Sequence, residues 1–492
     1  MTRQRWDGLY LAILGCAVFL GFGLIEEGAV PRAASDFRFV YNGTRCAIEG
    51  IDPYRQDEFL KVYLAEGGSV GSGASQQSYL VMTHYIYPPT SLILAPLAML
   101  PWTAANFVWS MFIAVGFVLA ALLIWDIGAE YAPIVSGFLV CCFVISAQTL
   151  LVIRNPVGVA ISFGMISIWC FFRQRFEWAG VCLLAVSLML KPHDAALLWL
   201  FLLLAGGSYR KRALQTLALT AVLSLPLMIW MANISPHWIP ELRSNLALLS
   251  SHGQVNDPSP TSPGARVPEM MVNLQTVVSV FRNEPAFYNP VTYVVCGSLI
   301  LIWSWITYRR RDSHAKVWFA LATIAPLSML PFYHRMFDAK LLLLTIPACA
   351  MLWASGGVKR SLSVFITLAI SVITSDVIWA IILHFLGRIQ SLNSSPMLLT
   401  VVEIFPVPLS LLAVSLFYLW TYIKKTETGG THVNVADPTL GEIANQDPSG
   451  KTAKSQYGLR RRTLQVSPIG PDADVGDERH IQLDYAFHLR AD

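Results

Sequence analysis

Charge is what this sequence lacks most. Aspartate, glutamate, lysine and arginine make up 13% of its 492 residues, whereas in soluble globular domains they make up about a quarter. Hydrophobic residues make up 54%, and the formal net charge is only +4. This composition excludes an ordinary soluble protein, and so small a net charge does not favour a nucleic-acid partner. We therefore expect a polytopic membrane protein.

The sequence also lacks a disulfide framework. Of its eight cysteines, only Cys46 falls outside the apolar runs, where a cysteine is a small packing residue. No Cys/His spacing typical of a metal site is present. Nor does a small-residue cleavage site follow the first apolar run, which Arg3 and Arg5 precede, so we expect a retained span.

Long apolar runs, by contrast, are abundant. A helix needs about 20 apolar residues to cross roughly 30 Å of hydrocarbon, and twelve runs reach or approach that length. They predict an all-α polytopic membrane protein with about twelve transmembrane helices and external juxtamembrane helices and loops. The runs are residues 9–25, 104–125, 132–151, 156–172, 177–190, 194–207, 213–232, 290–307, 315–331, 340–355, 361–385 and 400–423.

Basic residues lie in short clusters between these runs. If the spans alternate, all of the clusters fall on one side, which the positive-inside rule assigns to the cytoplasm. An even number of spans then places both termini in the cytoplasm, in a protein of the plasma (inner) membrane. The clusters are Arg3 and Arg5, Arg173 and Arg175, Arg210 to Arg212, Arg309 to Arg311, Lys359 with Arg360, and Lys424 with Lys425.

Residues 88–101 are apolar but short and bounded by prolines, and we expect a re-entrant or interfacial helix there. A full crossing would move two basic clusters to the outside, against the positive-inside rule. With this assignment the polar breaks between spans gather on the external, periplasmic face. These breaks are Asp36, His84, Arg154, Lys191 to Asp194, residues 233–289, and His334 with Arg335.

Two long external segments are expected, residues 26–87 and 233–289. The first contains a Gly/Ser-rich stretch, Gly67 to Ser78, which predicts a flexible link between short surface helices. The second contains the breaker-rich stretch Asp257 to Gly264, which predicts irregular structure and a mobile cover over the site.

The chain changes character after residue 423, where Gly, Thr, Asp and Pro replace the apolar residues. We therefore divide it into a transmembrane catalytic domain, 1–423, and a disordered cytoplasmic tail, 424–492. The cluster Arg460 to Arg462 in the tail has the charge to contact anionic lipid, although a solvated tail is favoured.

One polar stretch directly follows the first apolar run. It extends from Ser35 to Gly43 and places the carboxylate of Asp36 and the guanidinium of Arg38 among aromatic rings at a membrane boundary. An ionisable cluster there costs desolvation free energy unless it is solvated or used, so it indicates a functional site. The alternative is that Asp36 only caps a helix or pairs with Arg38.

Several short motifs then follow in order. They are Gly50-Ile51-Asp52-Pro53-Tyr54, Tyr87-Pro88-Pro89, Ala95-Pro96-Leu97, Leu100-Pro101 and Leu190-Lys191-Pro192. Together with Asp36 and its aromatic neighbours, this ordered set resembles glycosyltransferase family 87, from about Leu9 to Phe337 and weakly to residue 423. In one departure, this chain has Arg154-Asn155-Pro156 where relatives often carry Gly-Gln, which bears on the sugar specificity.

The resemblance implies a GT-C fold and an inverting enzyme of the cell envelope. Its donor would be a polyprenyl-phosphate sugar, most often mannose, and its acceptor a lipid or glycan. A polyprenyl phosphate leaves without a proton, so one carboxylate suffices, unlike the pair in a glycoside hydrolase. Asp36 is then the general base, while His334 assists it or binds the sugar. Lys191, Arg335 and Arg154 are candidates for the donor phosphate, or they simply snorkel.

Further side chains are candidates for substrate binding. Arg38 and His84 lie near Asp36 in the expected arrangement. Four tyrosines could stack on a sugar or line a prenyl groove, or could equally anchor the protein at the interface. They are Tyr41, Tyr54, Tyr85 and Tyr87.

No metal site is expected from the sequence. No spaced set of histidines or carboxylates accompanies His84, and the resemblance also implies metal independence, so the lipid-linked sugar is the only co-substrate expected. His193 and Asp194 could hold Lys191 in place, but the pattern favours a role in capping the helix that begins after Pro192.

Two functions of other classes compete with a transferase. A flippase or transporter of polyprenyl-linked sugars would recognise cargo without chemistry, and an inactive scaffold of the same fold would only bind partners. Transporters often place ionisable residues at mid-bilayer depth and contain internal repeats. This chain places its ionisable residues at span ends and shows no repeat, which favours an enzyme.

Overall fold

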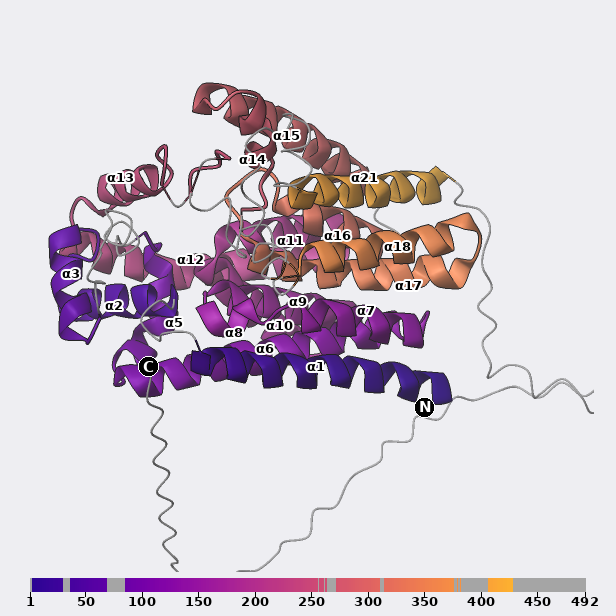
Figure 1. Ribbon diagram of the computed structural model, residues 1–492, viewed down its shortest axis with the longest axis horizontal. Coiled ribbons are helices and arrows are strands. Elements are labelled where there is room, and N and C mark those ends of the chain that lie inside the picture. The colour runs from indigo at the N-terminus through magenta and orange to yellow at the C-terminus, as the bar shows by residue number, and fades with distance from the viewer. Residues whose placement is uncertain are drawn as a thin grey trace, which may run out of the picture. The chain divides into compact units, whose positions relative to one another are not determined.

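The computed structural model describes residues 2–29, 36–68, 85–254, 256–260, 262, 271–309, 314–375, 378, 381 and 406–427. Regular structure within these ranges is helical, apart from one isolated antiparallel bridge between Met271 and Arg335. The all-helical expectation is therefore confirmed (Figure 1). The elements are α1 Arg3–Ala29, α2 Asp36–Ile48, α3 Gln56–Ala65, α5 Pro88–Ala98, α6 Trp102–Gly128, α7 Pro133–Ile145, α8 Thr149–Ile153, α9 Val157–Arg173, α10 Glu177–Leu190, α11 Pro192–Ala205, α12 Gly207–Ile234, α13 Trp238–Leu249, α14 Leu274–Phe281, α15 Pro285–Arg309, α16 His314–Ser328, the 3₁₀ helix η3 Met336–Thr345, α17 Ile346–Ser355, α18 Val358–Ile373 and α21 Pro406–Glu427.

Every predicted apolar run coincides with at least part of a helix. Within the described ranges, six helical segments are long and apolar enough to cross a membrane, and five shorter apolar helices accompany them. This is the pattern of a multi-pass membrane protein, although the count of twelve crossings and the cytoplasmic termini stay predictions. The six segments are Arg3–Ile25, Trp102–Gly128, Gly207–Ile234, Pro285–Arg309, Met336–Ser355 and Pro406–Lys424.

The run at 88–101 forms α5, which has 11 residues. At 1.5 Å per residue it is about 16 Å long, roughly half of what a crossing needs. It packs against α2, α10 and α12. Its length therefore fits the expected re-entrant or interfacial helix rather than a full span.

Paired glycines set two of the sharp turns between helices. Gly206 and Gly207 lie where α11 gives way to α12, and Gly356 and Gly357 separate α17 from α18. All four have positive φ, a conformation that residues with a side chain rarely adopt. The helices on either side of each turn pack against each other as hairpins.

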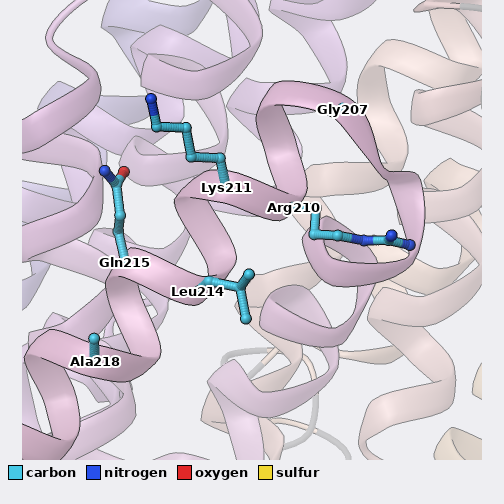
Figure 2. A pocket seen from close by; sticks show the side chains of 6 residues that line it. All are labelled: Gly207, Arg210, Lys211, Leu214, Gln215 and Ala218. Atoms are coloured by element: carbon cyan, nitrogen blue, oxygen red, sulfur yellow. The ribbon is translucent and has the colours of Figure 1, made fainter.

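A shallow surface hollow of about 560 Å³ lies over the first turns of α12 (Figure 2). This end of α12 carries one of the basic clusters that the sequence assigns to the cytoplasm. The hollow contains none of the residues proposed for chemistry. Its lining is Gly207, Arg210, Lys211, Leu214, Gln215 and Ala218.

Two of the expected cytoplasmic arginines meet on one carboxylate. On Asp126 of α6, Oδ1 lies 3.0 Å from Nη2 of Arg5, and Oδ2 lies 2.6 Å from Nη2 of Arg173. Arg173 also pairs with Glu130, and Trp169 donates its indole N–H to Asp126 at 3.3 Å. The beginning of α1 and the end of α9 therefore lie together, as the charge pattern requires if both face the cytoplasm.

A fully buried lysine joins the ends of two helices. Lys340, in η3, donates from Nζ to the carbonyl oxygens of Ser146 at 2.6 Å and Thr374 at 2.8 Å. These residues cap the C-termini of α7 and α18, where unpaired carbonyls and the helix dipole favour a cation. The sequence analysis did not single out Lys340.

Several expectations fall wholly or partly outside the described residues. They concern His84, the Gly/Ser-rich link from residue 69 onward, Thr261, Pro263 and Gly264 of the breaker-rich stretch, and the tail from residue 428. Inside the described part, the breaker-rich stretch begins as a buried turn. Asp257 accepts the N–H groups of Gly253 at 2.8 Å and Ser259 at 3.0 Å. α21 continues past residue 423 to Glu427.

α1 lies alongside α7 (Figure 1), and glycine permits their close approach. A Cβ atom on Gly137 would lie 2.0 Å from the carbonyl oxygen of Gly8, and one on Gly15 would lie 2.6 Å from Cα of Cys141. Both distances are far shorter than a van der Waals contact, and the obstructing atoms belong to the backbone, which cannot move aside as a flexible side chain can. A Cβ on Gly21, also in α1, would meet nothing within 4 Å.

We predict that Gly137→Leu destabilises the protein by about 3 kcal/mol or more, since the two helices must separate. The measurement is the temperature at which half of the purified protein is lost from its gel-filtration peak after heating. Gly21→Leu is the matched control and should change this temperature little. Equal losses for the two variants would contradict the close packing of α1 on α7.

Candidate active site

The break between α10 and α11 places a lysine between two carboxylates. α10 ends at Leu190 and Pro192 begins α11, so Lys191 lies between the helices. Its Nζ lies 2.6 Å from Oδ1 of Asp338 and 3.3 Å from Oδ2 of Asp194. Because both aspartates are buried, the ammonium compensates negative charge that water does not reach.

Hydrogen bonds from Val272 and Gln275 hold the residues before η3 in place. The N–H of Val272 donates to the carbonyl of His334 at 2.9 Å, and the side-chain amide of Gln275 donates to the carbonyl of Pro331 at 2.9 Å. Asp338 completes the arrangement, because its Oδ2 accepts the N–H of Arg335 at 2.7 Å and caps η3. The chain around His334 and Arg335 is thereby fixed from both sides.

The side chains of His334 and Arg335, at the corner of the chain before η3, have different partners. His334 is fully buried, and its Nε2 lies 3.0 Å from Oδ1 of Asp194. The guanidinium of Arg335 donates to the hydroxyl of Tyr333 and to Oδ1 of Asn256, the latter at 3.3 Å.

Asp36 begins α2 and is held by an asparagine from the α8–α9 junction. Its Oδ2 accepts a hydrogen bond from Nδ2 of Asn155 at 2.7 Å. Oδ1 of Asn155 in turn accepts the N–H of Val157, the first residue of α9, at 2.9 Å. Asp36 itself lies at the N-terminus of α2, where the helix dipole favours a charged carboxylate. A capping role and a chemical role of Asp36 are therefore compatible.

Aromatic packing fixes the position of α2 relative to this junction. The ring of Phe37 stacks on Trp109 with centroids 5.0 Å apart, and Trp109 donates its indole N–H to the carbonyl of Arg154 at 3.0 Å. Arg154 itself has φ 56°, a left-handed conformation that non-glycine residues seldom adopt. Such strain costs about 1–3 kcal/mol and is typical of functional sites.

Electrostatics link Asp36 to the cluster around Lys191. Burial raises the pKa of Asp36 above its ordinary value, the hydrogen bond from Asn155 and the charges of Arg335 and Lys191 oppose the rise, and Asp338 adds to it. Burial lowers the pKa of Lys191, but its two carboxylate partners outweigh this and raise it. Lys191 therefore stays protonated at neutral pH.

The side chains of Tyr85 and His334 also interact electrostatically with these residues. Burial raises the pKa of Tyr85 well above its ordinary value, and the charge of Asp36 adds to the effect, so the phenol stays neutral. Burial lowers the pKa of His334, but the carboxylate of Asp194 more than compensates, and the net direction is upward. Lys191, Asp194, Asp338 and His334 thus form one cluster of direct contacts, and Asp36 and Arg335 are linked to it electrostatically.

A family model decides the class of this protein. The model of glycosyltransferase family 87 matches residues 85–330, half of the chain. The chain belongs to glycosyltransferase family 87. This is a membrane GT-C family, so the protein is a membrane enzyme that takes a sugar donor and an acceptor. Comparisons with curated proteins and with solved structures gave no match.

The matched region contains only part of the cluster in this family 87 enzyme. Arg154, Asn155 and Lys191 lie within residues 85–330, whereas Asp36 precedes them and His334 follows. The membership therefore rests on the helical body, and the roles proposed for Asp36 and His334 rest on geometry and chemistry.

The remaining predicted substrate-binding residues of the glycosyltransferase have structural partners. Arg38 donates to the carbonyl of Glu66 at 2.7 Å and lies over the Trp102 ring at 4.9 Å. The hydroxyls of Tyr41 and Tyr54 donate to the carbonyls of Leu100 and Ile86, both at 2.8 Å, and both tyrosines are buried. Tyr87 is half-buried just before α5. Their roles toward a substrate stay predictions.

Sequence reasoning missed three partners in this glycosyltransferase. Asn155 was noted only as a departure from the family pattern, and Asp338 was not noted, although a carboxylate beginning a buried span is a signal in itself. The third is a spatial group of His193, Asp194 and His334, whose ligand-type atoms lie within 4.8 Å of one another. No local spacing reveals it, because His334 is remote in sequence.

We predict different stability effects for two isosteric substitutions at this site. The raised pKa of Asp36 means that its contribution to stability is full below the unfolded-state pKa of about 3.9 and is lost as pH rises through the folded-state pKa. At neutral pH, Asp36→Asn should therefore leave the melting temperature unchanged or raise it.

Asp338→Asn is the contrasting variant. It weakens the buried pair with Lys191, and breaking such a pair costs about 3–5 kcal/mol. Its melting temperature should fall clearly below that of the unaltered protein in the same assay. A fall for Asp36→Asn as large as that for Asp338→Asn would show that Asp36 serves chiefly to stabilise the fold.

Proposed function

We propose that this enzyme transfers a sugar from a polyprenyl-phosphate donor to a hydroxyl of a lipid-linked or glycan acceptor, with inversion at the anomeric carbon and Asp36 as general base. Mannose is the sugar proposed first, because the sequence resembles mannosyltransferases. The site would face the external, periplasmic side, opposite the basic clusters of Arg5 and Arg173.

One observation carries the proposal. The Asp36 carboxylate, held by Asn155 at 2.7 Å, interacts electrostatically with Arg335 and Lys191. A base for the acceptor and cations for a leaving phosphate are the two groups that this reaction needs. Their convergence from separate parts of the chain supports an enzyme over an inactive scaffold.

The proposed step balances as a single displacement. The acceptor hydroxyl gives its proton to Asp36 as its oxygen bonds to the anomeric carbon, on the face opposite the phosphate. The bond between that carbon and the phosphate oxygen breaks, and the electron pair stays on the polyprenyl phosphate. The raised pKa of Asp36 suits the role, because a base acts best when its pKa lies near the working pH.

The two cations would contribute unequally. Lys191 already lies against Asp338 and Asp194, so much of its charge is compensated. The guanidinium of Arg335 donates to Tyr333 and Asn256, and a guanidinium can donate two parallel hydrogen bonds to a phosphate, which an ammonium cannot. Arg335 is therefore the principal phosphate ligand in this proposal, with Lys191 in support and Arg154 nearby.

We predict that Asp36→Asn lowers transfer from a radiolabelled polyprenyl-phosphate sugar by about 10²–10⁴-fold, the usual contribution of a general base. The assay uses purified protein in nanodiscs, a panel of donors, and identification of the labelled lipid product. Asp57→Asn, on the exposed side of α3, is the matched control and should retain full activity. Normal transfer by Asp36→Asn would exclude the base assignment.

We also predict a shifted pH profile for Asn155→Ala. The hydrogen bond from Asn155 lowers the pKa of Asp36, so its loss raises that pKa further. Asp36 is then protonated at a higher pH, and the acid limb of the rate profile should move upward in pH. Asn245→Ala removes another side-chain amide that makes a hydrogen bond, here to the carbonyl of Tyr54, and should not move the limb. If the acid limb of Asn155→Ala stays in place or moves to lower pH, the hydrogen bond from Asn155 does not set the pKa of Asp36.

A further inference from the structure

Both ring nitrogens of His334 face oxygen atoms that accept hydrogen bonds. Nε2 lies 3.0 Å from Oδ1 of Asp194, and Nδ1 lies 3.2 Å from the carbonyl oxygen of Phe332. A neutral imidazole has one N–H group and one lone pair. Either neutral tautomer would therefore direct its lone pair at an oxygen, whereas the protonated ring carries an N–H group on both sides. The contacts thus favour the imidazolium form of His334.

The alternative is a proton on Asp194, whose carboxylic acid would then donate to a neutral ring. The other carboxylate oxygen argues against this, because Oδ2 of Asp194 lies 3.3 Å from the ammonium of Lys191. Lys191 is itself fixed by Asp338 at 2.6 Å. A nearby ammonium favours the ionised form of a carboxylate, so Asp194 is an anion that lies between two cations.

The titratable groups that face His334 come from two parts of the chain. Lys191 precedes α11, His193 and Asp194 lie in its first turn, and Asp338 lies in the first turn of η3. The ring of His193 is perpendicular to that of His334, with centroids 4.9 Å apart. The two carboxylates raise the pKa of His334, burial and the charge of Lys191 lower it, and the net direction is upward.

Charge balance supports the same conclusion. Around this corner the structure places three carboxylates and two permanently charged cations, Lys191 and Arg335. A protonated His334 makes the formal charges equal, whereas a neutral ring leaves one negative charge in excess. Residues 271–275, which pair with the backbone here, carry no titratable side chain, and Tyr333 pairs with Arg335. Because an uncompensated buried charge is strongly unfavourable, His334 supplies the missing cation.

We propose that His334 is a permanently protonated positioning residue, whose N–H groups hold Asp194 and thereby Lys191, and that it takes no part in proton transfer. Its side chain is 0% exposed, and neither nitrogen has a lone pair to accept a proton. His334 then neither assists the base nor binds the sugar. The part that Lys191 plays toward a phosphate rests on the proposed function, whereas the charge on His334 does not.

The direct test is the protonation state of the ring. The full chain, labelled with ¹⁵N-histidine and placed in nanodiscs, is measured by solid-state NMR at pH 8, where histidines with the ordinary pKa of about 6.5 are neutral. The signal that disappears in His334→Gln should be an imidazolium, with a proton on each nitrogen. Asp194→Asn should return this ring to the neutral form, which keeps the test valid if the glutamine variant misfolds. A neutral His334 in the unaltered protein overturns the proposal.

Protonation also predicts how stability depends on pH. Because the pKa of His334 is raised, its contribution to stability is full below the unfolded-state pKa of about 6.5 and is lost as pH rises through the folded-state pKa. The melting temperature of His334→Gln should therefore fall furthest below that of the unaltered protein near pH 6, and the gap should narrow by pH 9. His237→Gln, at the exposed start of α13, is the matched control and should show no such gap. A gap that stays constant from pH 6 to pH 9 contradicts the inference.

Transfer activity separates a positioning role from a catalytic one. If His334 acts through Lys191, His334→Gln should raise the KM for the polyprenyl-phosphate donor about tenfold and leave kcat nearly unchanged, because uniform binding is lost. Removal of a group that accepts the proton would instead lower kcat by about 10²–10⁴-fold, and a loss of that size overturns the positioning role. Failure of the proposed function would appear as no transfer by the unaltered protein, and it would leave the NMR and stability results standing.

Discussion

The ion pair between Lys191 and Asp338 is the constraint on which the rest of the site depends. It joins the break between α10 and α11 to the first turn of η3, residues 147 apart in sequence. Asp338 also caps the segment that carries His334 and Arg335, and Lys191 also contacts Asp194. A carboxylate that is buried must be compensated, so these groups have little freedom to separate, and the corner stays organised without a bound substrate.

Around that corner the fold brings together helix ends rather than helix faces. Asp36 begins α2, Asn155 precedes α9, Lys191 precedes α11, and Asp338 lies at the start of η3. Helix N-termini favour negative charge. This helps a largely apolar bundle to hold the carboxylates of Asp36, Asp194 and Asp338, each of which lies in the first turn of a helix. The same principle in reverse explains Lys340, whose ammonium lies on the C-terminal carbonyls of two helices. Membrane helices interrupted at such points can present backbone and charge without exposing either to lipid.

Much of this architecture could be predicted from the sequence, because apolar length alone dictates helices in a membrane protein. The runs and the short helix at 88–101 follow from hydropathy, and the charge pattern places Arg5 and Arg173 on one side, although it does not predict that both contact Asp126. The partners in the site could not be predicted in the same way. Asn155 reaches Asp36 across 119 positions, and His334 meets Asp194 across a similar distance. Nor does sequence tell a tyrosine that could stack on sugar from one that, like Tyr41, donates to a backbone carbonyl.

The central claim is that a lipid phosphate and an acceptor hydroxyl meet between Arg335 and Asp36. The most direct measurement is a cryo-EM structure of Asp36→Asn in nanodiscs with a polyprenyl-phosphate sugar. The account predicts density for the phosphate against the Arg335 guanidinium, with the anomeric carbon between it and the side chain at position 36. Density for the phosphate elsewhere, without contact to the Arg335 guanidinium, would contradict it.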